Sequence, residues 1–390
     1  MYLIVIYILL SLLLFIAKLM GFRPKKKIEV IIFLAVTAIF LLRFPQGADI
    51  YNYDYIFRNS TASLADSFHS HIMRNVLFTR LAYFCKMLFG EYRWFILVTN
   101  LLMFGLFSWT ILKNSRNILF SLLLLIGSGI LEVYISSGLR QAIAMAIMFF
   151  AFYQFLPKKK YLYFELFCII AAGFHDLALV AAPILLLMKL VPSFRDQPRK
   201  TAMIMAVISL GAFCLVHWGA VPFYRLFEAK FGTEAPWTHI FFYLQFQEFS
   251  ILGAGMEFVM CCGILILYGL ADRKKMTDFQ VFEVLVFFFS TLLYFAFADY
   301  SLMSRISDFL QVILVICIPN LIDLIPGVRR NAAAFAGVAA LNGFLLFSDV
   351  RAKASAVSSQ TDISYSIENY PYLSVFDQQG VDAYMDAQYD

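Results

Sequence analysis

The chain has 390 residues, of which 62% are apolar and 15% are charged, whereas soluble domains have roughly 45–50% apolar and about 25% charged residues. A soluble globule of this size cannot remove that much apolar surface from water, and 43 of the residues are phenylalanines. The composition therefore excludes a secreted or cytosolic enzyme, a disordered chain, a disulfide scaffold and a nucleic-acid-binding protein. The net charge of +5 is informative through its placement rather than its sum.

Apolar runs long enough to cross a bilayer, roughly 17–25 residues each, follow one another along the chain. They lie near 2–20, 28–43, 94–112, 118–134, 140–156, 201–217, 254–271, 279–297, 306–325 and 331–348. A longer run, 161–190, is interrupted by His175 and Asp176, and we interpret it as a hairpin of two short helices, 161–174 and 177–190. The sequence thus predicts an all-α polytopic membrane protein with about twelve transmembrane segments.

The placement of Lys and Arg predicts the orientation, because basic residues concentrate in short cytoplasmic loops. The clusters are Arg23/Lys25/Lys26/Lys27, Lys113/Arg116, Lys158/Lys159/Lys160, Arg195/Arg199/Lys200, Arg273/Lys274/Lys275 and Arg329/Arg330. All six clusters lie on the cytoplasmic side of the membrane if the N-terminus is outside. This arrangement requires that 161–190 crosses the membrane twice and that 74–90 does not cross it but lies in the interface or re-enters. We expect a single transmembrane domain, 1–348, with outer loops 44–93 and 218–253.

The remaining residues, 349–390, form an acidic tail on the same outer side. From residue 351 onward it has six acidic and two basic residues. It is too polar to cross the bilayer, and we expect it to pack loosely or to be partly disordered. Both termini are then outside.

The first candidate site is Ser136-Ser137-Gly138-Leu139-Arg140-Gln141. Serine is a good N-cap, so we expect a helix to begin here and run inward. The N-terminus of such a helix attracts anions, and the guanidinium of Arg140 adds donors suited to phosphate oxygens. The alternative is a structural ion pair between Arg140 and Glu132.

A second outer loop repeats this arrangement in Ser301-Leu302-Met303-Ser304-Arg305. Two helix starts of this kind are able to share one diphosphate. Here the structural alternative is pairing of Arg305 with Asp299 or Asp308.

Two further groups of residues carry side chains suited to proton transfer or to sugar contacts. His175 lies at the tip of the short hairpin, where an irregular backbone at membrane depth requires a protein-lined or wet cavity. Asp49 follows the second span, and Tyr51 and Tyr55 follow it with rings able to stack on sugars. The alternatives are a structural histidine, a turn aspartate and an interfacial aromatic belt. Arg58 either attracts an anionic headgroup or pairs with Asp54.

No nucleotide-binding loop and no metal motif is visible in the sequence. We therefore expect neither a cofactor nor a metal, and no ATP-driven chemistry.

The order of these residues resembles the EpsG-like, Wzy-type polysaccharide polymerases. The resemblance is carried by Gly47-Ala48-Asp49 with Tyr51 and Tyr55, Leu139-Arg140-Gln141-Ala142-Ile143-Ala144, the Lys158-Lys159-Lys160-Tyr161 turn, Ala172-Gly173-Phe174-His175 and the Arg305 helix. It covers roughly 45–325. The family often has an acidic residue near position 75, where this chain has Arg74 and Asn75.

The resemblance implies a GT-C-like membrane glycosyltransferase acting at the periplasmic face of the bacterial inner membrane. Its donor would be a glycan on undecaprenyl diphosphate, and its acceptor a lipid-linked repeat unit. A chain-length regulator protein is a candidate partner. The residues suit that chemistry. Arg140 and Arg305, with Ser137, are expected to bind the diphosphate, and His175 or Asp49 to act on the acceptor hydroxyl, with diphosphate binding as the alternative role for His175. The residues expected to contact the substrate are Tyr51, Tyr55, Arg58, Gln141 and Asp176.

Other functions in glycan assembly would require much the same residues. An O-antigen ligase would accept a lipid A core instead of a repeat unit, and a polyprenyl-phosphate-dependent sugar transferase would use a related donor. A transporter or flippase of lipid-linked glycans is expected to show internal repeats and charges at mid-membrane. The sequence shows neither, and this favours an enzyme.

Overall fold

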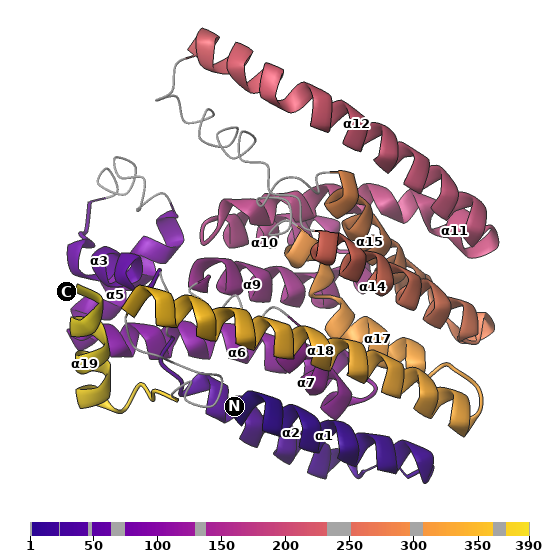
Figure 1. Cartoon of the computed structure of the whole chain (residues 1–390), viewed down its shortest axis with the longest axis horizontal. Coiled ribbons are helices and arrows are strands. Elements are labelled where there is room, and N and C mark those ends of the chain that lie inside the picture. Colours follow the sequence, from indigo (N-terminus) through magenta and orange to yellow (C-terminus); the bar gives the residue numbers. More distant parts are fainter. Residues whose placement is uncertain are drawn as a thin grey trace. The chain divides into compact units, whose positions relative to one another are not determined.

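Every regular element that the structure describes is a helix, as the apolar runs predict (Figure 1). The structure is a computed structural model that describes residues 2–22, 24–45, 49–63, 75–128, 138–231, 251–296, 307–361 and 372–389. The chain divides into two compact units. The first unit contains residues Met1–Ala182 and Ile325–Asp390, and the second contains Pro183–Leu324.

Among the described residues, 5 helices are long and apolar enough to cross a membrane. They are Tyr92–Asn114, Leu139–Lys158, Asp176–Asp196, Asp278–Phe295 and Val328–Ser348. Shorter apolar helices are Ile4–Leu19, Ile118–Gly127, Tyr161–Ala172, Gly255–Leu270 and Ser307–Ile322. The helical class is thus confirmed, whereas the count of about twelve spans and the GT-C-like architecture stay predictions.

The first unit is built around a short helix that is buried on all sides. Its helices are α1 (Tyr2–Leu19), α2 (Lys26–Leu41), α3 (Ile50–Asn59), α5 (Val76–Phe89), α6 (Tyr92–Asn114), α7 (Ile118–Gly127), α9 (Leu139–Phe155), α10 (Tyr161–Ala172), α18 (Val328–Thr361) and α19 (Gln378–Tyr389). Helix α7 is apolar apart from Ser121, and every one of its residues is buried. It packs against α1, α2 and α18, as a helix that is apolar on all sides must.

Polar side chains hold the end of α2 and the start of α7 in place. The amide of Asn100 on α6 donates to the backbone oxygens of Leu41 and Arg43, at 2.8 and 2.9 Å, and so holds the end of α2. The side chain of Asn117 accepts from the backbone N–H of Phe120 at 3.0 Å and caps α7. Such bonds satisfy backbone groups that a helix end leaves without partners.

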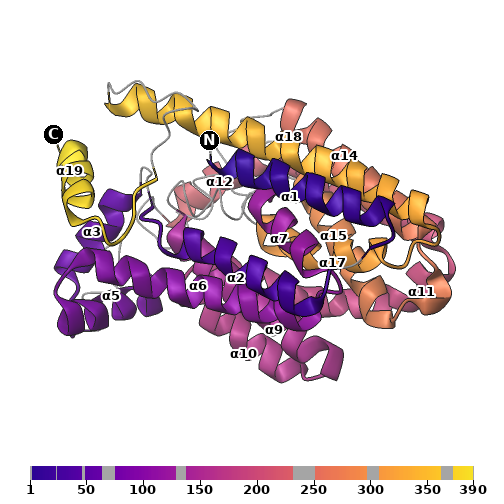
Figure 2. The same ribbon diagram turned by 90° about the horizontal axis from the view of Figure 1, so that it is seen from below.

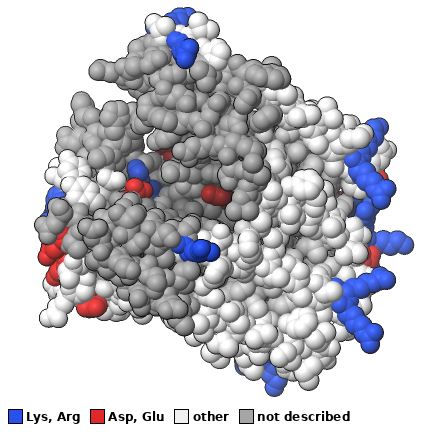
Figure 3. Space-filling model, in the orientation of Figure 1, with Lys and Arg blue, Asp and Glu red and all other residues white. Residues whose placement is uncertain are grey.

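The basic clusters of the first unit gather at one end of its helices. Lys18 at the end of α1 donates to Asn331 at the start of α18, at 2.7 Å. Lys113 at the end of α6 lies 3.4 Å from Gln154 at the end of α9. Figure 3 shows several Lys and Arg side chains near the right-hand margin of the view, and others elsewhere on this face. The orientation and the side of the membrane stay predictions.

The second unit is centred on α15 (Asp278–Ala296), which packs against α11 (Val191–Asp196), α12 (Pro198–Phe231), α14 (Ile251–Leu270) and α17 (Leu314–Ile322). Two of its basic clusters also meet. Arg195 forms an ion pair with Asp278 at 2.6 Å and donates to the backbone oxygen of Met276 at 3.0 Å.

Three elements differ from their predicted form. Helix α18 continues to Thr361, so the expected polar tail from 349 begins as helix. Helix α12 continues through Pro222 to Phe231, so the expected outer loop from 218 begins as helix. The second arm of the hairpin, Asp176–Leu190, is wound as a 3-10 helix containing Pro183. Proline has no N–H with which to continue an α-helical ladder.

The described residues 372–389 of the predicted tail are docked rather than loose. The backbone N–H of Phe44 donates to Leu373 at 2.7 Å, and that of Val375 donates to Leu42 at 2.9 Å. Val375 is 0% exposed, and the ring of Tyr384 on α19 meets Phe44 edge to face. The expectation of a loose tail was based on its acidic net charge. The contacts with α2 and Phe44 are instead made by apolar residues that alternate along this short segment.

We expect Val375→Asp to release this segment. A carboxylate at a fully buried apolar position lowers the free energy of unfolding locally by about 2–4 kcal/mol. Limited proteolysis of protein with a C-terminal epitope should then remove the epitope several-fold faster than from the wild type. The control is Gln379→Asp, which places the same charge at an exposed position. Equal cleavage rates for both variants would contradict the docking.

Candidate functional site

The candidate site of the first unit is centred on Arg140, in the first turn of α9. Its Nη1 donates to the side-chain oxygen of Asn75 at 3.0 Å. Its guanidinium carbon lies 5.7 Å from the centre of the Tyr53 ring, a geometry that stabilises a cation over an aromatic face. Its Nε is buried and has no hydrogen-bond partner among the described residues. Arg140 is therefore held on two sides and retains donor capacity.

The start of α9 only partly matches its prediction. The helix begins at Leu139, as expected, but the cap position belongs to Gly138, which offers no side-chain bond. Ser137 lies outside the described residues. The helix dipole and the first N–H groups are still directed to this end.

Asn75 joins Arg140 to the hairpin turn. Its amide nitrogen lies 3.4 Å from Oδ1 of Asp176, which is a long hydrogen bond. Asn75 immediately precedes α5, where an Asn side chain ordinarily caps the helix, yet here it makes no capping bond. Its side chain, 7% exposed, serves the Arg140–Asn75–Asp176 chain instead, which we call the polar relay.

A close backbone approach holds the hairpin turn against α5. The N–H of Leu77 donates to the oxygen of Gly173 at 2.9 Å. A Cβ on Gly173 would lie 2.5 Å from Cδ1 of Leu77, so the glycine permits this contact. The approach brings Asp176, three residues later, within reach of Asn75.

His175 lies in the same turn and is partly buried. Its Nδ1 accepts from the N–H of Leu177 at 3.4 Å. In the neutral ring this geometry favours the tautomer that carries its proton on Nε2. His175 is then better suited to donate to an anion than to accept a proton through Nδ1.

Helix α3 closes the site with Tyr53 and Asp49. Tyr53 is 1% exposed, and its burial raises its pKa to about 12, with the Arg140 cation opposing the rise and the Asp49 carboxylate adding to it. Asp49 immediately precedes α3 and lies 3.4 Å from the amide of Asn52. Arg140 thus lies over one buried ring, and Asp49 is one helical turn before that ring, with its backbone oxygen accepting from the N–H of Tyr53 at 3.0 Å.

The neutral state of Tyr53 has a measurable consequence. Because its folded pKa is above the ordinary value of 10, the folded protein holds this proton more tightly than the unfolded chain does. Stability is therefore lost as the pH rises from about 10 towards 12. Relative to Tyr53→Phe, the wild type should lose about 1 kcal/mol of unfolding free energy by pH 11.

Thermal unfolding in detergent at pH 8 to 11 measures this difference. Tyr51→Phe, which changes an exposed ring on the same helix, is the control and should keep the wild-type pH dependence. An identical pH dependence for Tyr53→Phe and the wild type would contradict the assignment.

The other predicted residues are placed as follows. Tyr51 and Tyr55 are 44% and 43% exposed on α3, and Gln141 is 4% exposed behind Arg140. Arg58 forms an ion pair with Asp54 at 2.7 Å, which is the structural alternative foreseen for it. Arg305 lies outside the described residues.

Sequence reasoning missed Tyr53 and Asn75. On a helix that buries Ile50, residue 53 shares the buried face whereas 51 and 55 do not, so the helical period would have selected Tyr53. Two signals pointed to Asn75: its position before α5, and the acidic residue that the resembled family often has near position 75. Among the described residues, no three His, Cys, Asp or Glu side chains are grouped to hold a metal ion.

The second unit has a separate buried polar cluster. The amide of Gln311 donates to the carboxylate of Glu257 at 2.6 Å and to the hydroxyl of Ser307 at 2.8 Å. Ser290 on α15 donates to the backbone oxygen of Ser307 at 3.1 Å. Glu257 is 5% exposed. These bonds compensate for burial of its carboxylate and join three helical segments.

Comparison with known proteins gives one match. The model of the EpsG family matches residues 26–374. No curated protein and no solved structure matches the chain. The matched range contains every predicted site residue, from Asp49 to Arg305, and ends before α19.

Proposed function

The chain belongs to the EpsG family, and we propose that it polymerises undecaprenyl-diphosphate-linked oligosaccharide repeat units into a surface polysaccharide. Apolar helices and the family both fit a membrane polysaccharide polymerase. The proposal places the reaction at the periplasmic face of the bacterial inner membrane, with both termini on that side. The observation that carries it is the polar relay, at the end of the helices opposite the basic clusters.

The proposed step transfers a growing glycan to one new repeat unit. The acceptor hydroxyl oxygen attacks the anomeric carbon of the donor's reducing-end sugar and forms the new glycosidic bond. The bond between that carbon and the diphosphate oxygen breaks, and undecaprenyl diphosphate leaves with the electron pair. The hydroxyl proton passes to a base on the protein. The energy is already present in the glycosyl diphosphate bond, so the step requires no nucleotide.

Arg140 is suited to stabilise the leaving group. Negative charge grows on the diphosphate in the transition state, and a donor fixed in place stabilises that charge without having to reorganise. Asn75 and Tyr53 hold the guanidinium, and its Nε has no partner among the described residues. We assign Arg140 to the diphosphate, and Arg305 and Ser137 to the same group.

The geometry supports a division of roles between His175 and the carboxylates. His175 accepts through Nδ1, so we assign it to donate from Nε2 to the diphosphate or a sugar oxygen. We assign deprotonation of the acceptor to Asp49, which lies beside Tyr53. Asp176 is exposed at the end of the polar relay and is suited to orient the acceptor hydroxyl.

The remaining assignments concern sugar contacts. The exposed rings of Tyr51 and Tyr55 are available to stack on sugars, and Arg58, one turn further along α3, offers a cation beside them. Gln141 is buried next to Arg140, and we assign it to support the start of α9. A chain-length regulator would associate from the same side.

The decisive experiment uses purified protein in liposomes with a lipid-linked repeat unit as the only substrate. Products differing by whole repeat units, with release of undecaprenyl diphosphate, are expected. A parallel reaction with lipid A core as the acceptor identifies a ligase, which would transfer once and form no ladder. Movement of the unit across the bilayer without any new glycosidic bond would identify a transporter and overturn the proposal.

A further inference from the structure

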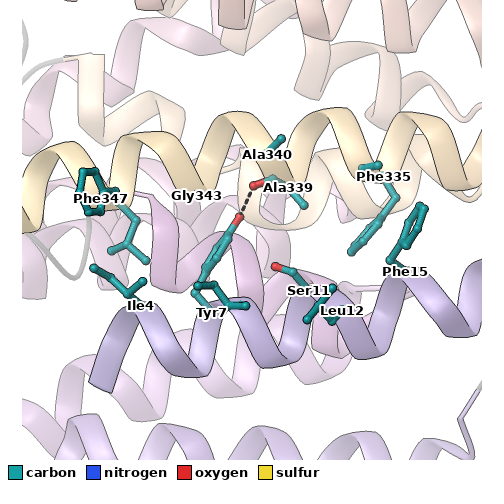
Figure 4. A pocket seen from close by; sticks show the side chains of 13 residues that line it. Ile4, Tyr7, Ser11, Leu12, Phe15, Phe335, Ala339, Ala340, Gly343 and Phe347 are labelled. Atoms are coloured by element: carbon teal, nitrogen blue, oxygen red, sulfur yellow. Dashed lines mark hydrogen bonds between the residues drawn. The ribbon is translucent and has the colours of Figure 1, made fainter. Parts of the chain in front are cut away.

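Helices α1 and α18 lie side by side in the first unit (Figures 1 and 2) and leave a groove between them of about 430 Å³. Figure 4 shows Phe335 and Phe15 at one end of the groove and Ile4 and Phe347 at the other. Between these ends α18 contributes small residues, including Ala340. The groove is therefore long and narrow, and aromatic rings mark its ends.

The groove presents mostly hydrocarbon to its contents. Two hydroxyls line it: that of Tyr7 donates to the backbone oxygen of Ala339 at 2.7 Å, and that of Ser11 is buried beside it. The close approach depends on Gly343, where a Cβ would lie 2.8 Å from the Tyr7 ring. Apolar neighbours on its outer side, Ile8 and Leu12, are about half exposed. The groove thus opens towards the surroundings of the helices, which in a membrane are lipid chains.

Cations lie at one end of this groove. Lys18 is one helical turn beyond Phe15, and its Nζ lies 5.8 Å from the centre of the Phe335 ring while donating to Asn331. The first turn of α18 adds the exposed side chains of Arg329 and Arg330. That turn also presents its N–H groups and the positive end of the helix dipole.

The groove is about as long as one acyl chain. From Ile4 to Phe15, α1 rises about 16 Å, and one acyl chain covers about half of a hydrocarbon core of roughly 30 Å. An ordinary acyl chain therefore fills the groove from the charged end to Ile4, whereas a polyprenyl chain is much longer than the groove.

We propose that the groove binds one acyl chain of an anionic phospholipid, with the lipid phosphate at Lys18 and the first turn of α18. The charge complementarity selects an anionic headgroup, and the position of the cations selects the leaflet at the basic end of the helices. The candidate functional site lies at the other end, so this lipid is distinct from the substrate of the proposed polymerase.

Native mass spectrometry of the full chain in mild detergent tests the proposal, using phosphatidylglycerol as the probe and phosphatidylcholine as the neutral comparison. Lys18→Gln removes the headgroup contact, and Ala340→Phe fills the groove. The matched controls are Lys26→Gln at the same end and Ala333→Phe on the same helix, outside the groove. We expect phosphatidylglycerol to bind about tenfold more tightly than phosphatidylcholine, and each groove variant to weaken it by about tenfold.

The proposal would be overturned if Lys18→Gln bound phosphatidylglycerol as tightly as the wild type does. It would also be overturned if each control variant lost as much phosphatidylglycerol affinity as the groove variant with which it is paired. So would undecaprenyl phosphate displacing phosphatidylglycerol at equal concentration, because the groove would then belong to the substrate. If Ala340→Phe fails to elute as a folded protein, the Lys18→Gln and Lys26→Gln pair decides the result. Binding is measured without catalysis, so failure of the polymerase assay leaves this test intact.

Discussion

Arg140→Lys should lower polymer formation by about 100- to 1000-fold at an unchanged amount of folded protein, the usual loss when a fixed donor to developing charge is removed. Lysine keeps the positive charge but lacks the planar fork that bonds Asn75 while lying over Tyr53. A mobile ammonium would also have to be reorganised in each transition state. The substitution therefore tests the geometry of the guanidinium rather than its charge.

The measurement is the rate of chain extension in liposomes, combined with the polysaccharide ladder of complemented cells. Arg116→Lys, an exposed arginine between α6 and α7, is the matched control and should give the wild-type ladder. A normal ladder from Arg140→Lys at normal protein level would remove Arg140 from the diphosphate site.

Asn75→Leu is expected to have the second largest effect. Leucine has a similar volume but leaves both the Nη1 of Arg140 and the carboxylate of Asp176 without their partner. A buried polar group that loses its partner costs about 1–3 kcal/mol, so chain extension should fall by roughly 10- to 100-fold. Asn75→Asp keeps an oxygen acceptor for Arg140 and should retain more activity.

A double-mutant cycle separates this role from a structural one. If Asn75 acts by holding Arg140, the double variant Asn75→Leu/Arg140→Lys should be scarcely worse than Arg140→Lys alone. Fully additive losses, or equal activity of Asn75→Leu and Asn75→Asp, would show that the polar relay does not operate as a unit.

The sequence predicted the helical class and most helix positions because membrane spans are long apolar runs, a signal that survives without tertiary information. The start of α9 at Leu139, for example, lies within one residue of its predicted position. The docking of Val375 against Leu42 could not be predicted, because it depends on a pairing between segments more than 300 residues apart. Composition alone describes such a tail as acidic and polar.

The candidate site shows the same limit. The sequence points to Arg140 because an ionisable residue close to the membrane is expected to be functional, and to Asp176 because it lies at the tip of the predicted hairpin. Asn75 is neutral and lies in a loop, so only the folded structure reveals that its side chain joins the two. Tyr53 lies between two other tyrosines in the sequence, and only its burial in the folded structure distinguishes it from the exposed rings of Tyr51 and Tyr55.

The division of the first unit between the two ends of the chain has a consequence for biosynthesis. Helices α1 and α7 pack against α18, but the ribosome must first translate the 142 residues of Pro183–Leu324. At about 5–20 residues per second this delay is roughly 7–30 s. During that time the nascent N-terminal helices wait in the bilayer without their last neighbour, so a chain released early cannot complete the unit that carries the site.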